Sequence, residues 1–273
     1  HSGFVPWDDD TDIAMMRSDY NRFLQVVEKE LPNGYVIYSP YSEKQSSQSF
    51  ARIVNGDEVT FAKERLKKFH GSPYISGVDI FPLDYLPRNE DERILQRDLY
   101  SFAMLMSRSD KDTENYEQGI GKIEEFCNVK IDRDKDIKKQ LLQLADAICS
   151  MYEEKDGDFL TTVAFYCTRQ YIQIPKSAYD EIVMLPFENM MIPAPKGYTV
   201  VLEKWYGDYM KPVRNTSSHE YPYYKKQRVE IEKELDKIEL EESRFKISKV
   251  LQIQDSEIKN LILEKKSWMN HTY

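Results

Sequence analysis

The first chemically active pattern is a run of aspartates near the start of the sequence. Asp8, Asp10 and Asp12 recur at every second residue between Trp7 and Ile13. In a strand, alternate side chains point to one face, so these carboxylates would lie together, roughly 6.5–7 Å apart at their backbones. Carboxylates this close repel one another unless a cation lies between them. Their oxygens suit a hard divalent ion, Mg²⁺ first and Mn²⁺ second.

Two other interpretations of the run compete with a metal site. An EF-hand loop also begins with alternate acids, but it needs glycine sixth and glutamate twelfth, where this sequence has Ile13 and Asp19. We therefore reject it. A solvated acidic turn is the other alternative, and the flanking Trp7 and the apolar run 13–16 favour an anchored, half-buried strand instead.

A third carboxylate lies further along the chain. Asp79 stands between Val78 and Ile80 in an apolar stretch, where an acid is costly unless it is paired or bound to a metal. Two-metal phosphoryl-transfer sites commonly need such a third acid. Asp84, after Pro82, is more typical of a cap or turn. Spacing alone does not connect Asp79 to the aspartate run, so the connection is a hypothesis.

The elements that must position these acids mix strands and helices. After a strand at 10–15, we expect a helix capped by Ser18 or Asp19 that runs toward Glu30 and buries an apolar stripe. Pro82 should end a later strand, and Asn55-Gly56 is a strong hairpin signal. Further extended segments are predicted at residues 35–38, 50–54, 74–81 and 163–174.

From about residue 91 the pattern becomes helical. The charged tail from Tyr223 to Ser267 has sparse apolar positions, which favours a helical arm over a second core. Strands first and helices after predict an α+β fold. Two apolar faces recur at helical spacing: Ile94, Leu95, Leu99, Phe102, Ala103 and Met106, then Ile137, Leu141, Leu144, Ala145, Ile148 and Tyr152.

Composition excludes several classes of protein. The 273 residues are 41% hydrophobic, enough for a core, and the formal net charge of -9 gives no general attraction for nucleic acid. No apolar run nears the roughly 20 residues that cross a bilayer, and no signal peptide is visible. Cys127, Cys149 and Cys167 form no metal or disulfide pattern, which indicates free thiols in a reducing compartment.

Four sequence blocks follow one another in the order of a known family. His1–Met15 and then Arg17–Tyr20 resemble the LicD signature H-x-G-F-I-P-W-D-D-D-x-D-I and R-x-D-Y. The ordered set is much more specific than any single block, and it covers residues 1 to about 212. The later blocks are Val78–Asp84, Leu185–Glu188 with Ile192–Pro195, and Tyr206–Met210.

The resemblance implies a fold and a division of the chain. LicD proteins are similar to fukutin-type transferases, with a nucleotidyltransferase-like mixed sheet and flanking helices. We expect this domain in residues 1–212 and a helical C-terminal extension in residues 213–273. The family's usual upstream strand and glycine-containing helix turn would precede His1, so we expect the domain to lack them. Residues 189–191 depart from the third block, so the acceptor groove should differ.

The resemblance also implies an activity. LicD proteins transfer a phospho-alcohol, often phosphocholine from CDP-choline, to a cell-surface glycan or its lipid-linked precursor, and they need a divalent metal. By family motif, Asp10 and Asp12 match metal ligands and Asp79 matches the third acid. We expect these three to hold Mg²⁺ (or Mn²⁺) and to carry catalysis, with Asp79 accepting the acceptor's proton and CMP released. Attack at the nucleotide phosphorus would release pyrophosphate instead.

Further residues are candidate substrate contacts. Arginines could balance the diphosphate charge, and aromatic faces with an acid suit a quaternary ammonium. Structural roles stay open for each: ion pairs for the arginines, packing for the aromatics and a turn at Gly207. The candidates are Trp7, Asp8, Arg17, Arg52, Tyr206, Asp208 and Tyr209, with His1 beside them.

The expected partners are a CDP-alcohol donor and a glycan or lipid-linked glycan acceptor, without nucleic acid. We expect a cytoplasmic location. A peripheral contact with the inner membrane face stays open, because Lys225-Lys226-x-Arg228 lies beside tyrosines and could touch an anionic surface. The oligomeric state is not indicated. A non-catalytic nucleotide- or glycan-binding protein of the same fold, or a structural adaptor, remains an alternative.

Overall fold

The computed structural model describes residues 2–5, 11–44, 46–167, 171–211, 213, 227 and 229–237. The chain divides into two compact units. The first combines residues 1–53 with 77–214, and the second combines 54–76 with 215–273. The second unit therefore includes residues 54–76, from the middle of the chain. The prediction assigned these residues to the domain 1–212 and not to the C-terminal extension 213–273.

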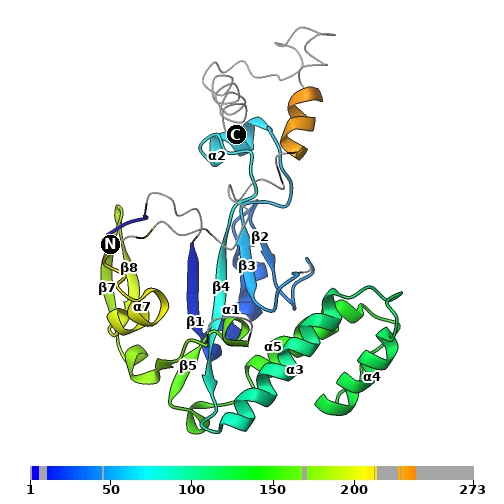
Figure 1. The fold of residues 1–273 in the computed structure, drawn as a ribbon. Helices are drawn as coiled ribbons and strands as arrows, with labels where there is room; N and C mark the ends of the chain where they lie inside the picture. Colours follow the sequence, from blue (N-terminus) through cyan, green and yellow to red (C-terminus); the bar gives the residue numbers. More distant parts are fainter. Residues whose placement is uncertain are drawn as a thin grey trace. The chain divides into compact units, whose positions relative to one another are not determined.

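A mixed sheet of six strands, counted over the described residues, organises the first unit (Figure 1). β1 runs parallel to β4, whereas β5 is antiparallel to β4 and to β6. Helices flank this sheet, so the predicted α+β class is confirmed. The main path is β2 (Val36–Tyr38), β3 (Ala51–Val54), β4 (Gly77–Leu86), β5 (Phe159–Thr161) and β6 (Ile174–Pro175), with β1 (Asp12–Met16) beside β4.

The helix α1 (Arg17–Glu30) covers one face of the sheet with the predicted apolar stripe. Tyr20 and Val27 lie in one buried cluster with Ile37, Ala51 and Ile80, which come from three strands. No side chain caps the helix, and the predicted caps Ser18 and Asp19 lie inside its first turn. The reason is that β1 passes directly into α1, which leaves no loop where a capping residue could stand.

Pro82 does not end β4, contrary to the prediction. The strand continues to Leu86, and along one edge its partner changes from β1 to β5 after Leu83. Pro82 lies next to this change of partner, where a missing N–H disrupts the ladder least. The strand therefore carries Asp84 inside the sheet and not in a turn.

The Asn55-Gly56 signal does not form a tight hairpin either. Asn55 N–H donates to Ser76 O at 3.0 Å, so the strand ends meet, but residues 56–75 form an excursion that contains α2 (Lys63–Lys68). The Asn55 side chain is used elsewhere: its Oδ1 accepts from Arg65 at 3.0 Å and from Ser76 N–H at 2.9 Å. These contacts belong to the second unit.

The second unit also contains the described part of the C-terminal arm. Residues 229–237 are helical, and Ile231 and Leu235 are buried. The Gln227 side chain accepts from Ile75 N–H at 2.8 Å and donates to Ile75 O at 2.9 Å. The rest of the predicted arm, with Lys225, Lys226 and Arg228, lies outside the described residues. Over the described part of the chain, no helix is both long and apolar enough to cross a bilayer.

Three helices lie between β4 and β5 in the chain: α3 (Glu90–Arg108), α4 (Tyr116–Cys127) and α5 (Ile137–Cys149). The predicted apolar face of α5 is buried, but that of α3 is partly wrong, because Ile94 and Leu95 are exposed. Gln96 is buried instead, and its amide donates to Ile148 O and Cys149 O at 3.0 and 3.2 Å. Hydrogen bonds from the Gln96 amide to these two carbonyl groups accompany its place in the core, which the apolar pattern did not predict.

The remaining elements lead to the last part of the first unit. The predicted extended stretch 163–174 begins instead as a helical turn, because Val163, Ala164 and Cys167 are all buried in one core and do not alternate. The remaining elements of the first unit are two 3-10 turns (Glu154–Asp156 and Lys176–Tyr179), α6 (Val163–Phe165), the hairpin of β7 (Ile182–Phe187) and β8 (Met190–Pro195), and α7 (Tyr198–Tyr206).

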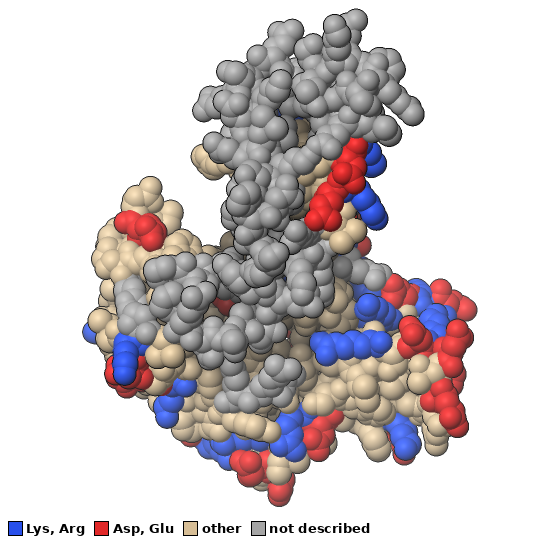
Figure 2. Space-filling view, turned by 45° about the horizontal axis from the view of Figure 1, so that its top comes forward, with Lys and Arg blue, Asp and Glu red and all other residues tan. Residues whose placement is uncertain are grey.

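The charged surface is mixed. On the face drawn in Figure 2, Lys and Arg side chains are interspersed with Asp and Glu side chains over the described residues. Elsewhere among the described residues, Arg88 pairs with Asp158 and Lys196 pairs with Glu181 at exposed positions.

Candidate active site

Asp12 and Asp79, here called the acid pair, lie on neighbouring strands. They are Cα partners in the parallel register of β1 and β4, and Asp79 N–H donates to Thr11 O at 3.3 Å. Partner residues on adjacent strands point to the same face, with backbones roughly 4.8 Å apart. The fold thus supplies the connection between the aspartate run and Asp79 that sequence spacing leaves open.

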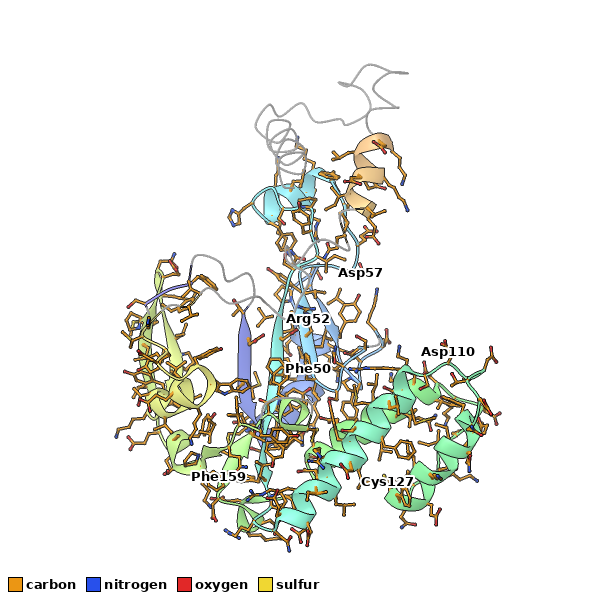
Figure 3. The ribbon with its side chains drawn as sticks, in the orientation of Figure 1. Phe50, Arg52, Asp57, Asp110, Cys127 and Phe159 are labelled. Atoms are coloured by element: carbon orange, nitrogen blue, oxygen red, sulfur yellow. The ribbon has the colours of Figure 1, made fainter. Side chains whose placement is uncertain are left out.

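Arg52, labelled in Figure 3, lies on β3 and reaches Asp79 from the other edge of β4. Its Nε lies 2.8 Å from Oδ1 of Asp79, and the two side chains are 33% and 20% exposed. The side chains of Arg52 and Asp79 are therefore both partly accessible to solvent. The guanidinium charge beside the Asp79 carboxylate gives this face groups of both signs, which suit diphosphate chemistry.

An aromatic row, Phe50, Phe81, Phe165 and Trp205, continues along the same face. Phe50 and Phe81 stand two residues from the partners of the ion pair, and their ring centroids are 4.4 Å apart. Phe165 lies 4.9 Å from Phe81, and Trp205 lies 6.0 Å from Phe165. Phe81 is buried, whereas the other three rings are half-buried.

The sequence-based interpretation did not identify this row. Alternation could have indicated Phe50, which precedes Arg52 by two residues and so shares its face. No local pattern could have indicated Phe165 or Trp205, because they come from α6 and α7. Ile80, one residue from Asp79, faces α1 on the opposite side of the sheet.

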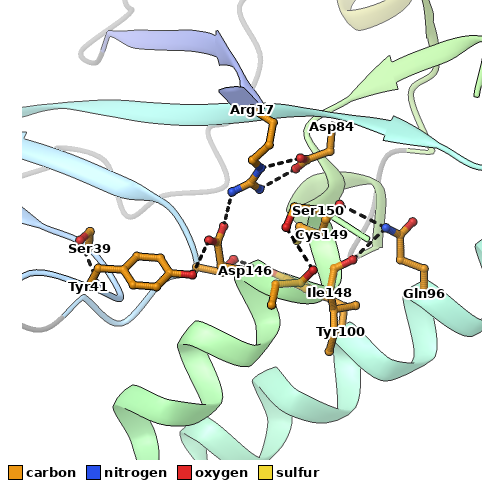
Figure 4. A network of polar contacts seen from close by, with 12 residues as sticks. Arg17, Ser39, Tyr41, Asp84, Gln96, Tyr100, Asp146, Ile148, Cys149 and Ser150 are labelled. Carbon is orange, nitrogen blue, oxygen red and sulfur yellow. Dashed lines mark hydrogen bonds and ion pairs between the residues drawn. The ribbon is translucent and has the colours of Figure 1, made fainter. Parts of the chain in front are cut away.

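Arg17 lies at the other end of β1, in a buried network with Asp84, Asp146 and Tyr41 (Figure 4). Its Nε and Nη2 donate to Asp84 at 2.6 and 2.7 Å, and its Nη1 donates to Asp146 at 2.8 Å. The Tyr41 hydroxyl donates to Asp146 at 2.8 Å. Asp84 is five residues beyond Asp79, about 16 Å along a strand. The structure therefore does not bring Arg17 to the acid pair.

The buried network contains one guanidinium and two carboxyl groups. Burial raises the pKa of Asp84 to about 6, although the hydrogen bonds and charge of Arg17 oppose this shift. Burial alone would lower the pKa of Arg17, but Asp84 and Asp146 outweigh it and raise that pKa above its ordinary value. Arg17 thus stays charged, whereas burial, helped by the nearby Asp146, makes Asp84 easier to protonate.

The fourth sequence block follows α7. Gly207 has φ 65°, a left-handed conformation that suits glycine, and Tyr209 N–H donates to Gly207 O at 2.8 Å. The chain therefore turns at Gly207, as in the structural alternative for this block, but Tyr206 does not enter the core as that alternative expected. Tyr206 and Asp208 are exposed, and Tyr209 is half-buried. Trp205 brings this block to the aromatic row.

Other predicted residues cannot be placed. His1, Trp7, Asp8 and Asp10 lie outside the described residues. The third block, at the tip of the β7–β8 hairpin, contacts the start of the first block through Phe187 and Phe4, whose ring centroids are 4.8 Å apart.

A divalent metal fits the described residues in donor type. Asp12 and Asp79 offer hard oxygen ligands on one face, as Mg²⁺ and Mn²⁺ prefer. Within the described part of the chain, no group of three or more His, Cys, Asp or Glu could hold a metal ion. The third predicted ligand, Asp10, is outside that part, so the complete ligand set stays a prediction.

Comparisons with known proteins bear on this site. Residues 1–84 match the family described as LicD/FKTN/FKRP, nucleotidyltransferase domain. The chain is also 29% identical over 222 residues to the lipopolysaccharide cholinephosphotransferase LicD of Haemophilus influenzae, a match that covers 77% of each chain. The resemblance to the LicD family is confirmed. The LicD match contains the acid pair and Arg52. No solved structure matches this chain.

Proposed function

We propose that this protein transfers a phospho-alcohol, phosphocholine first among the candidates, from a CDP-activated donor to a cell-surface glycan or its lipid-linked precursor. CMP would be the second product. The observation that carries the proposal is the register of β1 and β4, which places Asp12 beside Asp79 on the face that Arg52 reaches. The name of the Haemophilus relative, a lipopolysaccharide cholinephosphotransferase, supports the alcohol and the acceptor class.

A divalent ion belongs to the proposal. Asp12 and Asp79, with Asp10 as the predicted third acid, would hold Mg²⁺ or Mn²⁺. When bound, such an ion neutralises the charge of the donor diphosphate and of the departing nucleotide phosphate.

The chain's own residues would bind and orient the substrates. Arg52 offers several N–H donors in a planar arrangement that matches phosphate oxygens, and its ion pair with Asp79 keeps it at this face. Asp79 would accept the proton of the acceptor hydroxyl as general base. The hydroxyl oxygen would form a bond to the phosphorus that bears the alcohol, and the bond from that phosphorus to CMP would break.

The aromatic row supports an alcohol with a quaternary ammonium group. Phe165 lies at 52° to Phe81, at 49° to Phe50 and at 86° to Trp205. Rings in several planes suit a rounded trimethylammonium group, whereas a flat base stacks best on one parallel face. Phe81 is two positions beyond Asp79 on β4, roughly 6.5–7 Å along the strand, so a short phospho-alcohol could reach both regions.

The direct test is product identity. The protein, Mg²⁺, CDP-choline and an acceptor glycan extract should give CMP and choline-labelled glycan. Release of pyrophosphate from a nucleoside triphosphate, without CMP from any CDP-alcohol, would instead make the protein a nucleotidyltransferase. Binding of CDP-choline without any turnover would leave a non-catalytic binding protein and overturn the proposal.

A further inference from the structure

We infer that Arg17 and Asp84 are positioning residues that set the register of β1 against β4 and thereby place Asp12 beside Asp79. The inference rests on the proposed function, since it concerns the acid pair of that site. The ion pair of Arg17 with Asp84 lies about 16 Å along the strand from the acid pair. It therefore acts through the two strands and not by contact with a substrate.

The ion pair and the acid pair share one register. Asp79 follows Asp12 by 67 positions, and Asp84 follows Arg17 by the same number. The ladder of β1 with β4 ends one step before Arg17 and Asp84, so these two residues occupy the next step of the same pairing. A contact that holds Arg17 to Asp84 therefore specifies the alignment in which Asp12 meets Asp79.

The apolar surface of β1 specifies its register only weakly. Residues 12–14 are exposed, and Met15 and Met16 are half-buried. A strand whose two faces differ little in burial can slip along its partner, because a slip moves little apolar surface into water. The backbone contact at the start of the ladder is long, with Asp79 N–H 3.3 Å from Thr11 O. A further contact is therefore needed to select one alignment.

The ion pair supplies that selection, because a slip would separate two buried charges. A slip of one residue would turn the side chains of β1 to the other face of the sheet. A slip of two residues would place Arg17 opposite Pro82 or Leu86, both of which are buried and uncharged. Asp84, which is 1% exposed, would then lie in the sheet without that cation. Burial of an unpaired charge is strongly destabilising, so the observed register is favoured over these alternatives.

The helix α5 holds Arg17 from a third direction. Arg17 Nη1 donates to Asp146 Oδ1 at 2.8 Å, and the Tyr41 hydroxyl donates to Asp146 Oδ2 at 2.8 Å. The guanidinium carbon also lies 5.2 Å from the centroid of the Tyr20 ring. With two further N–H groups on Asp84, the guanidinium is fixed in both place and orientation. The end of β1 is thus attached to an element outside the sheet.

The energetics of the ion pair favour a role in specificity over one in stability. Burial raises the pKa of Asp84 to about 6, although the hydrogen bonds and charge of Arg17 oppose this shift. At neutral pH the folded chain therefore holds this carboxylate ionised at a net cost in free energy. Apolar side chains of similar volume often stabilise a protein as well as a buried ion pair does, and specifying register is the best-attested use of such pairs.

The test removes the charges and keeps the side-chain volume. The variant is Arg17→Met with Asp84→Leu and Asp146→Asn, so that no buried carboxylate is left without its arginine. Its Tm should stay within about 4 °C of the unmodified protein or rise. Its kcat for CMP release should fall roughly 10- to 100-fold, because small misplacements of reacting groups have effects of this size. Asp146→Asn alone keeps the ion pair and should change neither quantity.

Disulfide trapping measures the register without any need for activity. Asp12→Cys is combined with Gly77→Cys, Asp79→Cys or Phe81→Cys in three separate chains, and peptide mass spectrometry identifies the bonds after mild oxidation. A disulfide needs Cα atoms within about 7 Å, which positions 12 and 79 satisfy, whereas positions 77 and 81 lie roughly 8 Å from position 12. With the ion pair intact, only position 79 should be trapped. In the triple variant, position 77 or 81 should be trapped as well.

The matched control is Arg88→Met with Asp158→Leu. Arg88 also donates two hydrogen bonds to one aspartate, at 2.8 and 2.7 Å, but this ion pair is exposed. Its removal should leave both the trapping pattern and kcat unchanged. Trapping of position 79 alone in the triple variant would overturn the inference and assign the register to the packing of α1.

A second variant covers the case in which the triple variant does not fold. Asp84→Asn keeps one acceptor for Arg17 but no charge, so it should give the same new disulfides in lower yield, and their absence would overturn the inference. New disulfides to position 77 or 81, with no CMP released by the unmodified chain from any CDP-alcohol, would sink the proposed function and leave Arg17 and Asp84 their role in the register.

Discussion

Asp12 and Asp79 are neighbours with unlike surroundings. Asp12 is exposed at the start of β1, whereas Asp79 is half-buried with the Arg52 guanidinium 2.8 Å away. Loss of the Asp79 carboxylate would leave a mostly buried arginine without that partner, which is costly. Loss of Asp12 removes one of two close negative charges and leaves Arg52 and Asp79 paired. The two acids should therefore differ in their contribution to stability although both serve the proposed chemistry.

We predict that Asp12→Ala abolishes turnover and leaves the metal-free fold about as stable as before. Removal of one member of a crowded acid group relieves repulsion, so Tm should change by no more than about 2 °C. Thermal unfolding without metal and CMP release with Mg²⁺ measure the two effects. Asp19→Ala, which removes an exposed aspartate on α1, should change neither. A large fall in Tm for Asp12→Ala would show that the acid is structural.

At the scale of elements, the buried network joins the C-terminal ends of β1 and β4 to α5. Arg17 and Asp84 are 67 residues apart in sequence, and Arg17 and Asp146 are 129 apart. One side chain therefore ties together the strand that carries Asp12, the strand that carries Asp79 and the helical layer. The network lies far from the acid pair but acts on the same two strands, so it stabilises their register.

The raised pKa of Asp84 predicts how this network responds to pH. The folded pKa of about 6 exceeds the unfolded value, roughly 3.9, so the folded state binds more protons between them. The Asp84 carboxyl therefore makes its full contribution to the free energy of unfolding below about pH 4, and this contribution declines as the pH rises through about 6. From pH 4 to pH 7, the free energy of unfolding of the unmodified protein minus that of Asp84→Asn should fall by at most about 2–3 kcal/mol.

Urea unfolding of both proteins from pH 4 to pH 7 measures that difference. Comparison with Asp84→Asn cancels the titration of the other carboxyl groups, which both proteins share. A difference that grew as pH rose would mean that the ion pair with Arg17 outweighs burial, and that Asp84 is ionised more readily in the fold than in the unfolded chain.

At the scale of the whole first unit, one sheet face collects residues from distant segments. Phe50 precedes β3, Phe81 is on β4, Phe165 is on α6 and Trp205 is on α7. The aromatic row thus forms only when the late helices fold onto the early strands. Selectivity for the alcohol, on the proposed function, is a property of this assembly and not of the LicD-matched residues 1–84 alone.

Trp205→Leu tests that property. It should lower kcat/KM for CDP-choline by roughly 5- to 30-fold, the size of a partly desolvated cation–π contact, and affect CDP-ethanolamine much less. Competition between the two donors measures the change directly. Phe126→Leu, at an exposed ring on α4, is the matched control and should leave the ratio unchanged. Equal losses for both donors would mean that Trp205 only supports packing.

Local patterns in the sequence were sufficient for the elements that have a clear period. The stripe of α1, the face of α5, the strand that ends the aspartate run and the α+β class all follow from side-chain spacing within a few turns or residues. The ordered blocks also identified the LicD resemblance. Errors arose where tertiary contacts override the local signal. The Gln96 amide donates to the end of α5, Pro82 lies beside β1, and the Asn55 side chain accepts from Arg65.

Only the tertiary structure decided which charges meet. Parallel pairing of β1 with β4 places Asp12 beside Asp79 and Arg17 beside Asp84, and β3 on the other edge of β4 brings Arg52 to Asp79. The tertiary structure also brings Phe4 N–H to the Glu188 carboxylate. These contacts join residues that are tens to more than a hundred positions apart, and no period along the chain encodes such a pairing. Their choice depends on how the whole set of strands and helices buries its apolar surface at once.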